Sequence, residues 1–337
     1  MRITSHARLA PSPGRRLLAV TAAGLLVLGL AACGSSESDE PEAKGSDEAV
    51  TLRIAHTASA AHLPVAVADA EGFFEDHGIK TELTQLGTAA FAQAPSLVGR
   101  QYDVAFGTEP VFLTAVRSGL DIKIVGGSFL EKSSIEDTLL LASPESGVKS
   151  LTDLRGKRVG APSMSGNLNL STQAAIKKAG VDLDDVKFVQ VDTANMPDSL
   201  KAGRIDAAEV TSPVSGALVG QGYVKLTYPP AAVGDPVNQA LWMADAKWAD
   251  ENTDVIKSYV AALDEAIAWI EKNPEDALEL LIERSKVPPQ YESSLVMPAF
   301  SATYSPENLK KWADTITYVN GEKFNLDFTK LIAEPAR

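Results

Sequence analysis

The stretch SLVGRQYDVAFGTEPV, residues 96–111, decides the fold because the chain repeats its pattern further on. The segment SLKAGRIDAAEVTSPV, residues 199–214, aligns with it without a gap. Each copy has the pattern of a helix end, a turn containing glycine, a short strand and a new helix with proline in its first turn. The repeat predicts two similar lobes, each built on one large unit. Both copies share an aspartate, a threonine and a proline: Asp103, Thr108 and Pro110 in the first, Asp206, Thr211 and Pro213 in the second.

Apolar runs with strand character alternate with helical patterns from Thr51 onward. Short strands that alternate with helices of roughly ten residues are typical of an α/β fold with largely parallel sheets. The fold class that we expect is therefore α/β. The predicted strands cover residues 51–56, 80–86, 103–107, 121–127, 137–143, 157–162, 186–192, 206–212, 224–228 and 238–245.

The last part of the chain has mostly helical patterns. An amphipathic pattern predicts a long helix over residues 253–273, and a proline near the start of residues 274–286 and 305–320 predicts two more helices. Because a strand is predicted just before them, at 238–245, we expect the chain to return there to the first lobe and these helices to pack on it. The four tryptophans should lie in the core or between helices: Trp242, Trp248, Trp269 and Trp312.

Residues 1–33 have the pattern of an export signal. Four arginines precede an uncharged run, residues 17–32, that is too short and too rich in alanine and glycine for a transmembrane helix. The run ends in LAAC, and Cys33 is the only cysteine of the chain, so a disulfide within the chain is excluded. This ending resembles the lipobox of bacterial lipoproteins, in which the cysteine is acylated and becomes the first residue of the mature protein. Arg15 and Arg16 leave open whether export uses the general or the twin-arginine route.

Residues 34–49 are rich in serine, glycine and acidic residues, and predict a disordered acidic tether. The chain carries a net charge of −13, and loss of a signal with four arginines and no acidic residue gives −17. Such a protein does not bind nucleic acid or anionic lipid through charge. We therefore expect an extracytoplasmic monomer that is lipid-anchored to the cell membrane at Cys33.

Four segments carry a resemblance to a known family. The stretch PVAVADAEGFFEDHGIKTEL, residues 64–83, resembles the opening of the nitrate/sulfonate/taurine family of solute-binding proteins for ABC importers, which includes binders of thiamine-pyrimidine precursors. Residues 97–107 and 200–214 resemble the family's repeated turn, and residues 150–160 resemble its entry into the second lobe. The order and spacing of these segments, between residues 50 and 270, carry the resemblance.

The resemblance implies the type II periplasmic-binding fold, with two Rossmann-like lobes joined by two crossover strands and a ligand between them. It implies lobe 1 over residues 50–142, lobe 2 over 143–236, and a return to lobe 1 with C-terminal helices over 237–337. The implied function is a substrate-binding protein that captures a small-molecule solute and delivers it to the membrane permease of an ABC importer. No enzyme activity, cofactor or metal is implied.

The ligand site should lie where strand carboxyl ends meet helix N-termini, since amide N–H groups and the helix dipole are free there. Six such junctions contain neither lysine nor arginine. One of them, residues 163–169, precedes a helix pattern that begins near Leu170, and its polar residues could bind a ligand or only cap the helix. The predicted ligand-binding residues are His56, Thr57, Thr88, Thr108, Glu109, Ser163, Ser165, Asn167, Thr193, Thr211 and Ser212.

The identity of the solute stays open at this point. A carboxylate at Glu109 would repel an anion and attract an ammonium group, so a zwitterion such as taurine fits, and an aliphatic sulfonate or taurine is the first expectation. The alternative is a thiamine-pyrimidine precursor or another aromatic solute, stacked on Phe91 or Phe129. Glu109 could also be an ordinary first-turn acid, and His56 an ordinary strand-end histidine. An enzyme on the same fold, or a sensor for a membrane receptor, is the rival class.

Overall fold

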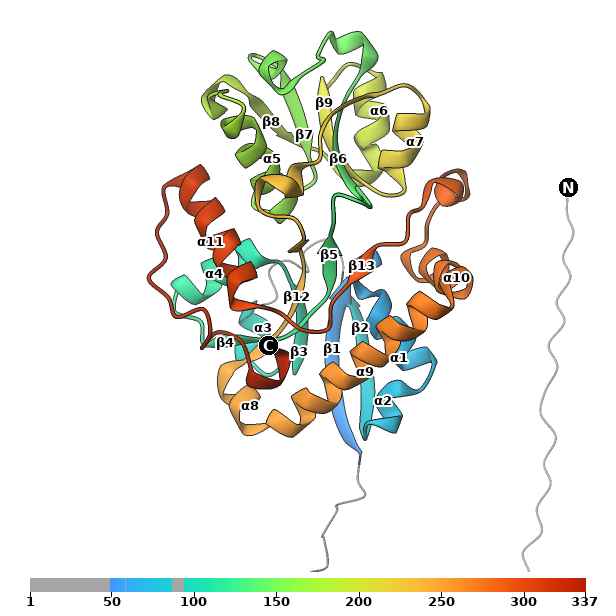
Figure 1. Ribbon diagram of the computed structural model, residues 1–337, viewed down its shortest axis with the longest axis vertical. Coiled ribbons are helices and arrows are strands. Elements are labelled where there is room, and N and C mark those ends of the chain that lie inside the picture. Colours follow the sequence, from blue (N-terminus) through green and yellow to red (C-terminus); the bar gives the residue numbers. More distant parts are fainter. Residues whose placement is uncertain (1–48, 58, 87–93) are drawn as a thin grey trace, which may run out of the picture. The chain divides into compact units, whose positions relative to one another are not determined.

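The computed structural model describes residues 49–57, 59–86 and 94–337 of the chain (Figure 1). Cys33, the predicted signal and residues 34–48 lie outside these ranges, as do Thr88 and Phe91. Within them, no helix combines the length and the apolar character that crossing a membrane requires.

The first sheet has five strands in the order β2-β1-β3-β12-β4. β1, β2 and β3 run parallel, whereas β12 is antiparallel to both of its neighbours, β3 and β4. We call the part of the molecule built on this sheet lobe 1. Its strands are β1 (Val50–Thr57), β2 (Ile79–Leu86), β3 (Val104–Gly107), β4 (Ile122–Gly127) and β12 (Leu241–Asp245). Its helices include α1 (Leu63–Ala70), α2 (Phe73–Asp76), α3 (Ala94–Val98) and α4 (Glu109–Arg117).

The second sheet, which defines lobe 2, has the order β10-β6-β9-β7-β8. Read from the other end, this is the topology of the first sheet: β7, β8 and β9 are parallel, and β6 lies antiparallel between β9 and β10. The repeat found in the sequence is therefore confirmed as two sheets of one topology. The strands are β6 (Thr138–Ala142), β7 (Arg158–Ala161), β8 (Lys187–Gln190), β9 (Ala207–Thr211) and β10 (Val224–Thr227), and the helices include α5 (Asn167–Lys178), α6 (Met196–Lys201) and α7 (Val214–Gly220).

The chain passes between the sheets next to β6 and next to β12. A small third sheet, β11-β5-β13, lies at these passages and consists of β5 (Phe129–Glu131), β11 (Val237–Asn238) and β13 (Ala299–Phe300). β6 pairs in the second sheet, so the first passage comes before it and not at residue 142 as the sequence suggested. The single strand expected over residues 238–245 is also wrong: it is split into β11 and β12, because Gln239 and Ala240 leave the ladder.

A buried carboxyl ties the third sheet to lobe 2. Glu131 of β5 is 1% exposed and accepts hydrogen bonds from the hydroxyls of Thr138 and Tyr228, the latter at 2.9 Å. Burial raises the pKa of Glu131 to about 7, and the two hydrogen bonds offset part of this rise. The passage between the sheets is thus held by side chains as well as by its backbone.

Buried apolar cores lie on both faces of the second sheet. Along β6, Leu139 and Leu141 belong to one buried cluster, while Leu140 and Ala142 belong to another. Alternate side chains of a strand point to opposite faces, so a strand buried on both sides reads as a continuous apolar run. The predicted α/β fold class is confirmed.

The C-terminal helices follow the sequence pattern closely: α9 spans Thr253–Lys272, α10 spans Pro274–Ser285 and α11 spans Pro306–Asn320. α9 packs on α1 and α2 of lobe 1, as expected, but α11 contacts both α4 of lobe 1 and α5 of lobe 2. Trp242, Trp248 and Trp312 are buried, and Trp269 is half-buried. The expectation that these helices belong to lobe 1 alone is therefore incomplete.

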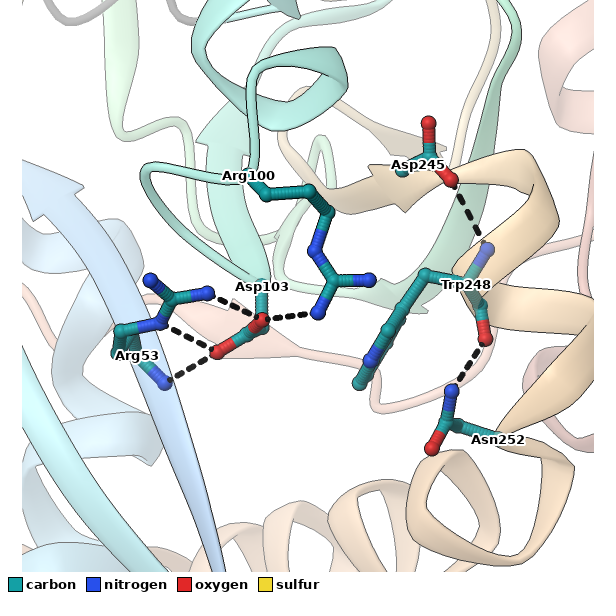
Figure 2. Close-up of polar contacts among 6 residues, drawn as sticks. All are labelled: Arg53, Arg100, Asp103, Asp245, Trp248 and Asn252. Atoms are coloured by element: carbon teal, nitrogen blue, oxygen red, sulfur yellow. Dashed lines mark hydrogen bonds and ion pairs between the residues drawn. The ribbon is translucent and has the colours of Figure 1, made fainter.

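An arginine–aspartate pair joins the strands at the amino end of β3 (Figure 2). Asp103 accepts hydrogen bonds from the backbone N–H of Arg53 at 3.1 Å, from its guanidinium at 2.9 and 2.8 Å, and from Arg100 at 3.0 Å. Arg158 and Asp206 make the same contacts in lobe 2, at 2.8 Å from the backbone and at 3.0 and 3.2 Å from the guanidinium. The hydrogen bonds from the arginine outweigh burial and lower the pKa of each aspartate.

The far C-terminal segment lies along β4. Ile332 forms a parallel bridge with Ile124, whose N–H donates to Leu331 and whose carbonyl accepts from Ala333, both at 2.8 Å. The backbone of Tyr304 in turn donates to Ala336 at 2.7 Å. Residues 331–333 thus cover the outer edge of the first sheet.

Candidate functional site

The candidate site lies at the carboxyl ends of β1 and β3 in lobe 1 and of β7 and β9 in lobe 2. At each of these ends the chain turns into a helix, so that helix N-termini and strand ends lie together, which is where open α/β sheets hold their ligands. In lobe 1, β3 ends at Gly107 and α4 begins at Glu109. In lobe 2, β7 ends at Ala161 and α5 begins at Asn167.

Thr108 and Glu109 form the turn from β3 into α4. Thr108 is the residue before the helix, is 2% exposed, and its hydroxyl makes no capping bond and has no hydrogen-bond partner within the described residues. Glu109, the first helical residue, is 0% exposed. The side chain of Thr108 therefore does not cap α4, because a capping hydroxyl would accept a hydrogen bond from an N–H group of the first helical turn.

The carboxyl of Glu109 has one oxygen bound and one free. Tyr304, after β13, donates its phenolic hydrogen to Oε1 at 3.1 Å, while Oε2 is buried without a partner among residues that the structure describes. Burial raises the pKa of Glu109 to about 8, and the hydrogen bonds that it accepts offset only part of this rise. At neutral pH the group is mostly protonated, so it can donate as well as accept. It is neither the exposed first-turn acid nor the ionised carboxylate that the sequence suggested.

His56, at the end of β1, stacks on His62, with ring centroids 4.4 Å apart and an angle of 14° between the planes. Both are buried, and each Nδ1 lies near a backbone carbonyl, of Thr57 at 3.2 Å and of Ser59 at 3.1 Å, so each Nδ1 carries the hydrogen. Burial lowers the pKa of both rings, that of His62 to about 4. The positive charge of Arg284, on α10, lowers both further. The pair is thus neutral near pH 7.

The helix of lobe 2 begins three residues earlier than its pattern suggested. α5 starts at Asn167, with Gly166 as the preceding residue in extended conformation. Asn167 and Asn169 therefore belong to the first turn of the helix and not to the loop, since residues with low helix propensity are tolerated at helix starts. Ser163 is half-buried and Ser165 is exposed.

Asn167 contacts the segment between β11 and β12. Its Nδ2 donates to the backbone carbonyl of Gln239 at 2.6 Å and to the side-chain Oε1 of Gln239 at 3.1 Å. The two residues are 7% and 3% exposed. This is a direct polar contact from a predicted ligand residue of lobe 2 to the chain that enters lobe 1.

The remaining predicted residues are less enclosed. Thr57, at the end of β1, shares a hydrogen bond with Ser59 at 2.9 Å. Thr193 is exposed and Thr211 is half-buried. Ser212 is already engaged: its N–H donates to Asp137 and its Oγ accepts from the N–H of Val296, both at 2.9 Å. Thr88 lies outside the described residues.

Lobe 2 has its own buried acid in contact with the first turn of α5. Glu209, on β9, is 2% exposed and accepts from Nδ2 of Asn169 at 2.9 Å. Burial raises its pKa to about 8, and hydrogen bonds to it offset part of the rise. In the repeat this position corresponds to Phe106 of lobe 1, so the sequence alignment gave no signal for it.

Three residues near the strand ends escaped the sequence analysis: Gln239, Tyr304 and Arg284. Gln239 lies two residues before β12, whereas Asp137 of lobe 2 lies directly before β6, and the repeat found in the sequence extends to neither. Tyr304 and Arg284 reach the site from segments far along the chain. Nothing in the local sequence signals such long-range contacts.

A metal centre and a hollow between helices are two other kinds of candidate site. No cluster of three or more histidine, cysteine, aspartate or glutamate side chains is placed to hold a metal ion in the described part of the chain. A hollow of about 800 Å³ lies between α9, α10 and the end of α1, and is lined by Glu71, Trp269 and Glu279 among others. Because it adjoins the C-terminal end of α1, it lies at the opposite end of that helix from His56 and His62.

Comparisons with known proteins agree with this architecture. A binding protein of Brucella abortus (strain 2308) is 26% identical over 226 residues, which are 66% of this chain and 67% of that protein. A formylaminopyrimidine-binding protein of Halalkalibacterium halodurans is 22% identical over 268 residues, 77% of this chain and 76% of that one. The crystal structure of the periplasmic aliphatic sulphonate-binding protein SsuA of Escherichia coli superposes with a TM-score of 0.67 at 19% identity, over 85% of this chain and 98% of that one.

The fold is therefore that of periplasmic solute-binding proteins of ABC importers. The profile of one family covers most of the two sheets, from residue 59 to residue 277. The chain belongs to the NMT1/THI5-like family.

Proposed function

We propose that this protein is an extracytoplasmic substrate-binding protein of an ABC importer, held at the membrane through a lipid on Cys33. It captures a small organic solute between its lobes and delivers it to a permease. One observation carries the proposal: two consecutive residues at the carboxyl end of β3, Thr108 and Glu109, each bury a polar atom that has no partner among the residues that the structure describes. Buried polar groups are normally paired, so such atoms are expected where a ligand binds.

Lobe closure is the mechanism that fits the two passages between the sheets. A solute that contacts both lobes binds the closed state more tightly than the open one and shifts the population toward it. The closed form then docks on the permease. The second sheet has two buried clusters of its own, and the first sheet has another that also includes Leu170 of α5.

A nitrogen heterocycle such as a thiamine-pyrimidine precursor is the first candidate solute. An aminopyrimidine presents an N–H donor beside a ring-nitrogen acceptor, and a protonated carboxyl can pair with both. Glu109, with a pKa raised to about 8, supplies such a carboxyl, whose Oε2 has no partner among the described residues, and the Thr108 hydroxyl supplies a further site. The relative from Halalkalibacterium halodurans carries the name of a pyrimidine binder.

An aliphatic sulfonate or taurine, the first expectation from sequence, is the second candidate. Arg284 supports it, because the charge of this residue reaches His56 and His62 and would also attract a sulfonate. A protonated Glu109 would donate to a sulfonate oxygen and not repel it. The sulphonate-binding neighbour from Escherichia coli shares the fold.

The test is thermal unfolding of the full chain with formylaminopyrimidine, taurine, an alkanesulfonate and nitrate added separately. A solute that binds only the folded state adds about 2.7 kcal/mol at a hundredfold excess over Kd and raises the midpoint. We expect the pyrimidine to give the largest shift. Glu109→Gln loses the acidic hydrogen and should weaken the affinity for the pyrimidine about tenfold, which makes the shift smaller. The exposed Glu75→Gln should leave the shift unchanged.

The same samples separate binding from catalysis. After incubation, chromatography should recover the solute unchanged, because a binding protein releases what it binds. A shift with the sulfonate alone would keep the class of protein and reverse the order of the two solutes. Conversion of the solute by the isolated protein would favour an enzyme on this fold and overturn the proposal.

A further inference from the structure

Gln239 lies between the small third sheet and the first sheet. Its backbone N–H donates to Phe129 of β5 at 2.9 Å, which fixes it to the third sheet. β12 pairs with β3 so that its first residue, Leu241, is opposite Gly107, the last residue of β3, and Gln239 precedes Leu241 by two residues. The residue therefore stands at the passage into lobe 1 and at the strand end that carries the candidate site.

The two ends of its side-chain amide have different surroundings. Oε1 accepts from Asn167 of lobe 2 at 3.1 Å, and this contact fixes which way the amide points. Nε2 is buried and has no hydrogen-bond partner in the part of the chain that the structure describes. An amide nitrogen that is shielded from water normally donates to an acceptor, so this group is available to one.

Two more buried atoms without partners belong to the neighbouring residues of β3 and α4, namely Thr108 Oγ1 and Glu109 Oε2. Gln239 Nε2 thus adds a donor to a set that otherwise offers a carboxyl and a hydroxyl. None of these three residues belongs to lobe 2. Gln239 alone among them also holds lobe 2, through Asn167.

We propose that Gln239 is a positioning residue that couples solute binding to lobe closure, with its Oε1 holding Asn167 of lobe 2 and its Nε2 donating to an acceptor atom of the solute. Only one part of this proposal, the contact between Nε2 and the solute, rests on the proposed function; we call this part the solute half. A bound acceptor fixes the amide in the orientation that Asn167 requires, so that the same side chain stabilises the solute and the closed arrangement.

Two substitutions separate the contact of Gln239 with lobe 2 from its contact with the solute. Asn167→Ala removes the contact between the lobes and leaves Gln239 free to reach the solute. Gln239→Glu keeps an acceptor for Asn167 and replaces the free donor by an oxygen. A matched control is Asn252→Ala, since Asn252 also donates from Nδ2 to a backbone carbonyl, that of Trp248 at 2.8 Å, but within lobe 1 (Figure 2).

The first measurement needs no solute. Spin labels at Glu75→Cys on α2 and Lys201→Cys on α6, both exposed positions, report the distance between the lobes in the full chain with Cys33→Ser. Asn167→Ala should lengthen and broaden the distance distribution, while Gln239→Glu and Asn252→Ala should leave it unchanged. An unchanged distribution in Asn167→Ala would overturn the contact between the lobes as a determinant of closure.

The second measurement is calorimetric titration with formylaminopyrimidine and with taurine. For the probe that binds the wild type, Gln239→Glu should weaken affinity about tenfold, the cost of one lost donor. Wild-type affinity in Gln239→Glu would overturn the solute half. If neither probe binds the wild type, the proposed solutes fail, whereas the spin-label result still decides whether Gln239 and Asn167 hold the lobes.

Discussion

β3 of lobe 1 and β9 of lobe 2 occupy the same place in sheets of the same topology, and a comparison of their two ends separates scaffold from site. At the amino end, each strand follows an aspartate that binds an arginine of the neighbouring strand, Asp103 with Arg53 and Asp206 with Arg158. At the carboxyl end the lobes diverge, since Glu109 follows the shared threonine in lobe 1 where Ser212 stands in lobe 2. The residues that join strands are retained, and those at the candidate site differ.

Each lobe also buries one glutamate with a pKa of about 8, but in a different place. Glu109 lies after β3, at the strand end, with Tyr304 as its donor. Glu209 lies within β9 and binds Asn169 of the same lobe. Both carboxyls keep an Oε2 without a partner among the described residues, so the difference between them is their place: Glu109 follows the end of its strand, whereas Glu209 lies within its strand.

We expect the largest effect to come from pH, acting on both glutamates. An unfolded glutamate ionises near pH 4.5, whereas Glu109 and Glu209 stay protonated in the folded protein up to about pH 8. The folded state therefore binds more protons in this window, and the free energy of unfolding falls as pH rises through it. His56 and His62, with lowered pKa values, act oppositely but only below their ordinary value of 6.5.

Between pH 6.5 and 8 the loss should approach about 1.4 kcal/mol per pH unit for each carboxyl. Urea unfolding at several pH values measures it. Glu109→Gln and Glu209→Gln should each flatten the curve by one carboxyl's share, with Glu131 and Asp137 contributing to the rest in the same direction. Curves parallel to that of the wild type would show that these glutamates ionise normally.

The next effect compares one glycine from each lobe. A Cβ on Gly127 of β4 would lie 2.6 Å from the backbone oxygen of Ser301 and closer still to that of Thr303. A Cβ on Gly160 of β7 would meet side-chain atoms instead, Ile205 Cδ1 at 2.5 Å and Met196 Sδ at 2.9 Å. Side chains can move aside, whereas a tethered backbone cannot, so Gly127→Ala should cost about 3 kcal/mol and Gly160→Ala about 1 kcal/mol of unfolding free energy. Equal losses in denaturant titrations would refute this reasoning.

The smallest effect tests the shared arginine–aspartate pair. Asp103 is 7% exposed and binds two arginines, whereas Asp206 is 15% exposed and binds one. Removing each carboxyl leaves backbone and guanidinium donors unpaired, and we expect a loss of about 2 kcal/mol for Asp103→Ala and about 1 kcal/mol for Asp206→Ala. Scanning calorimetry of the variants measures these losses. The control is Asp314→Ala, because the exposed pair of Asp314 with Lys310 should contribute almost nothing to the free energy of unfolding. A larger loss from Asp206→Ala would reverse the comparison.

Much of this scaffold could be predicted from the sequence. The repeat of residues 96–111 and 199–214 leads directly to two sheets of one topology, and all ten strand patterns fall on observed strands. The pattern of residues 238–245 predicts one continuous strand because an apolar run, residues 240–244, follows Gln239, yet the chain is outside the ladder at Gln239 and Ala240. The three strands of the small third sheet are too short, at two or three residues, to show a period.

The candidate site could be predicted only where local pattern determines it. Strand ends and helix starts are local features, so Thr108, Glu109 and Asn167 could be named from the sequence. Burial and partners are set by distant segments, such as Tyr304 on Glu109 and Val296 on Ser212, and no local signal reports them. This is why the state of Glu109 was misjudged while its position was not.

The segment along β4 also bears on aggregation. An uncovered edge strand offers its N–H and C=O groups to any other chain that can add a strand. Residues 331–333 occupy that position on the first sheet, so another copy can extend the sheet at β4 only by displacing them. On lobe 2 the corresponding edge strand, β10, instead carries the exposed Lys225, which is paired with Glu136, and charged side chains at an edge oppose the addition of further strands. The two lobes thus protect a sheet edge against association by different means, one with a backbone segment and the other with charged side chains.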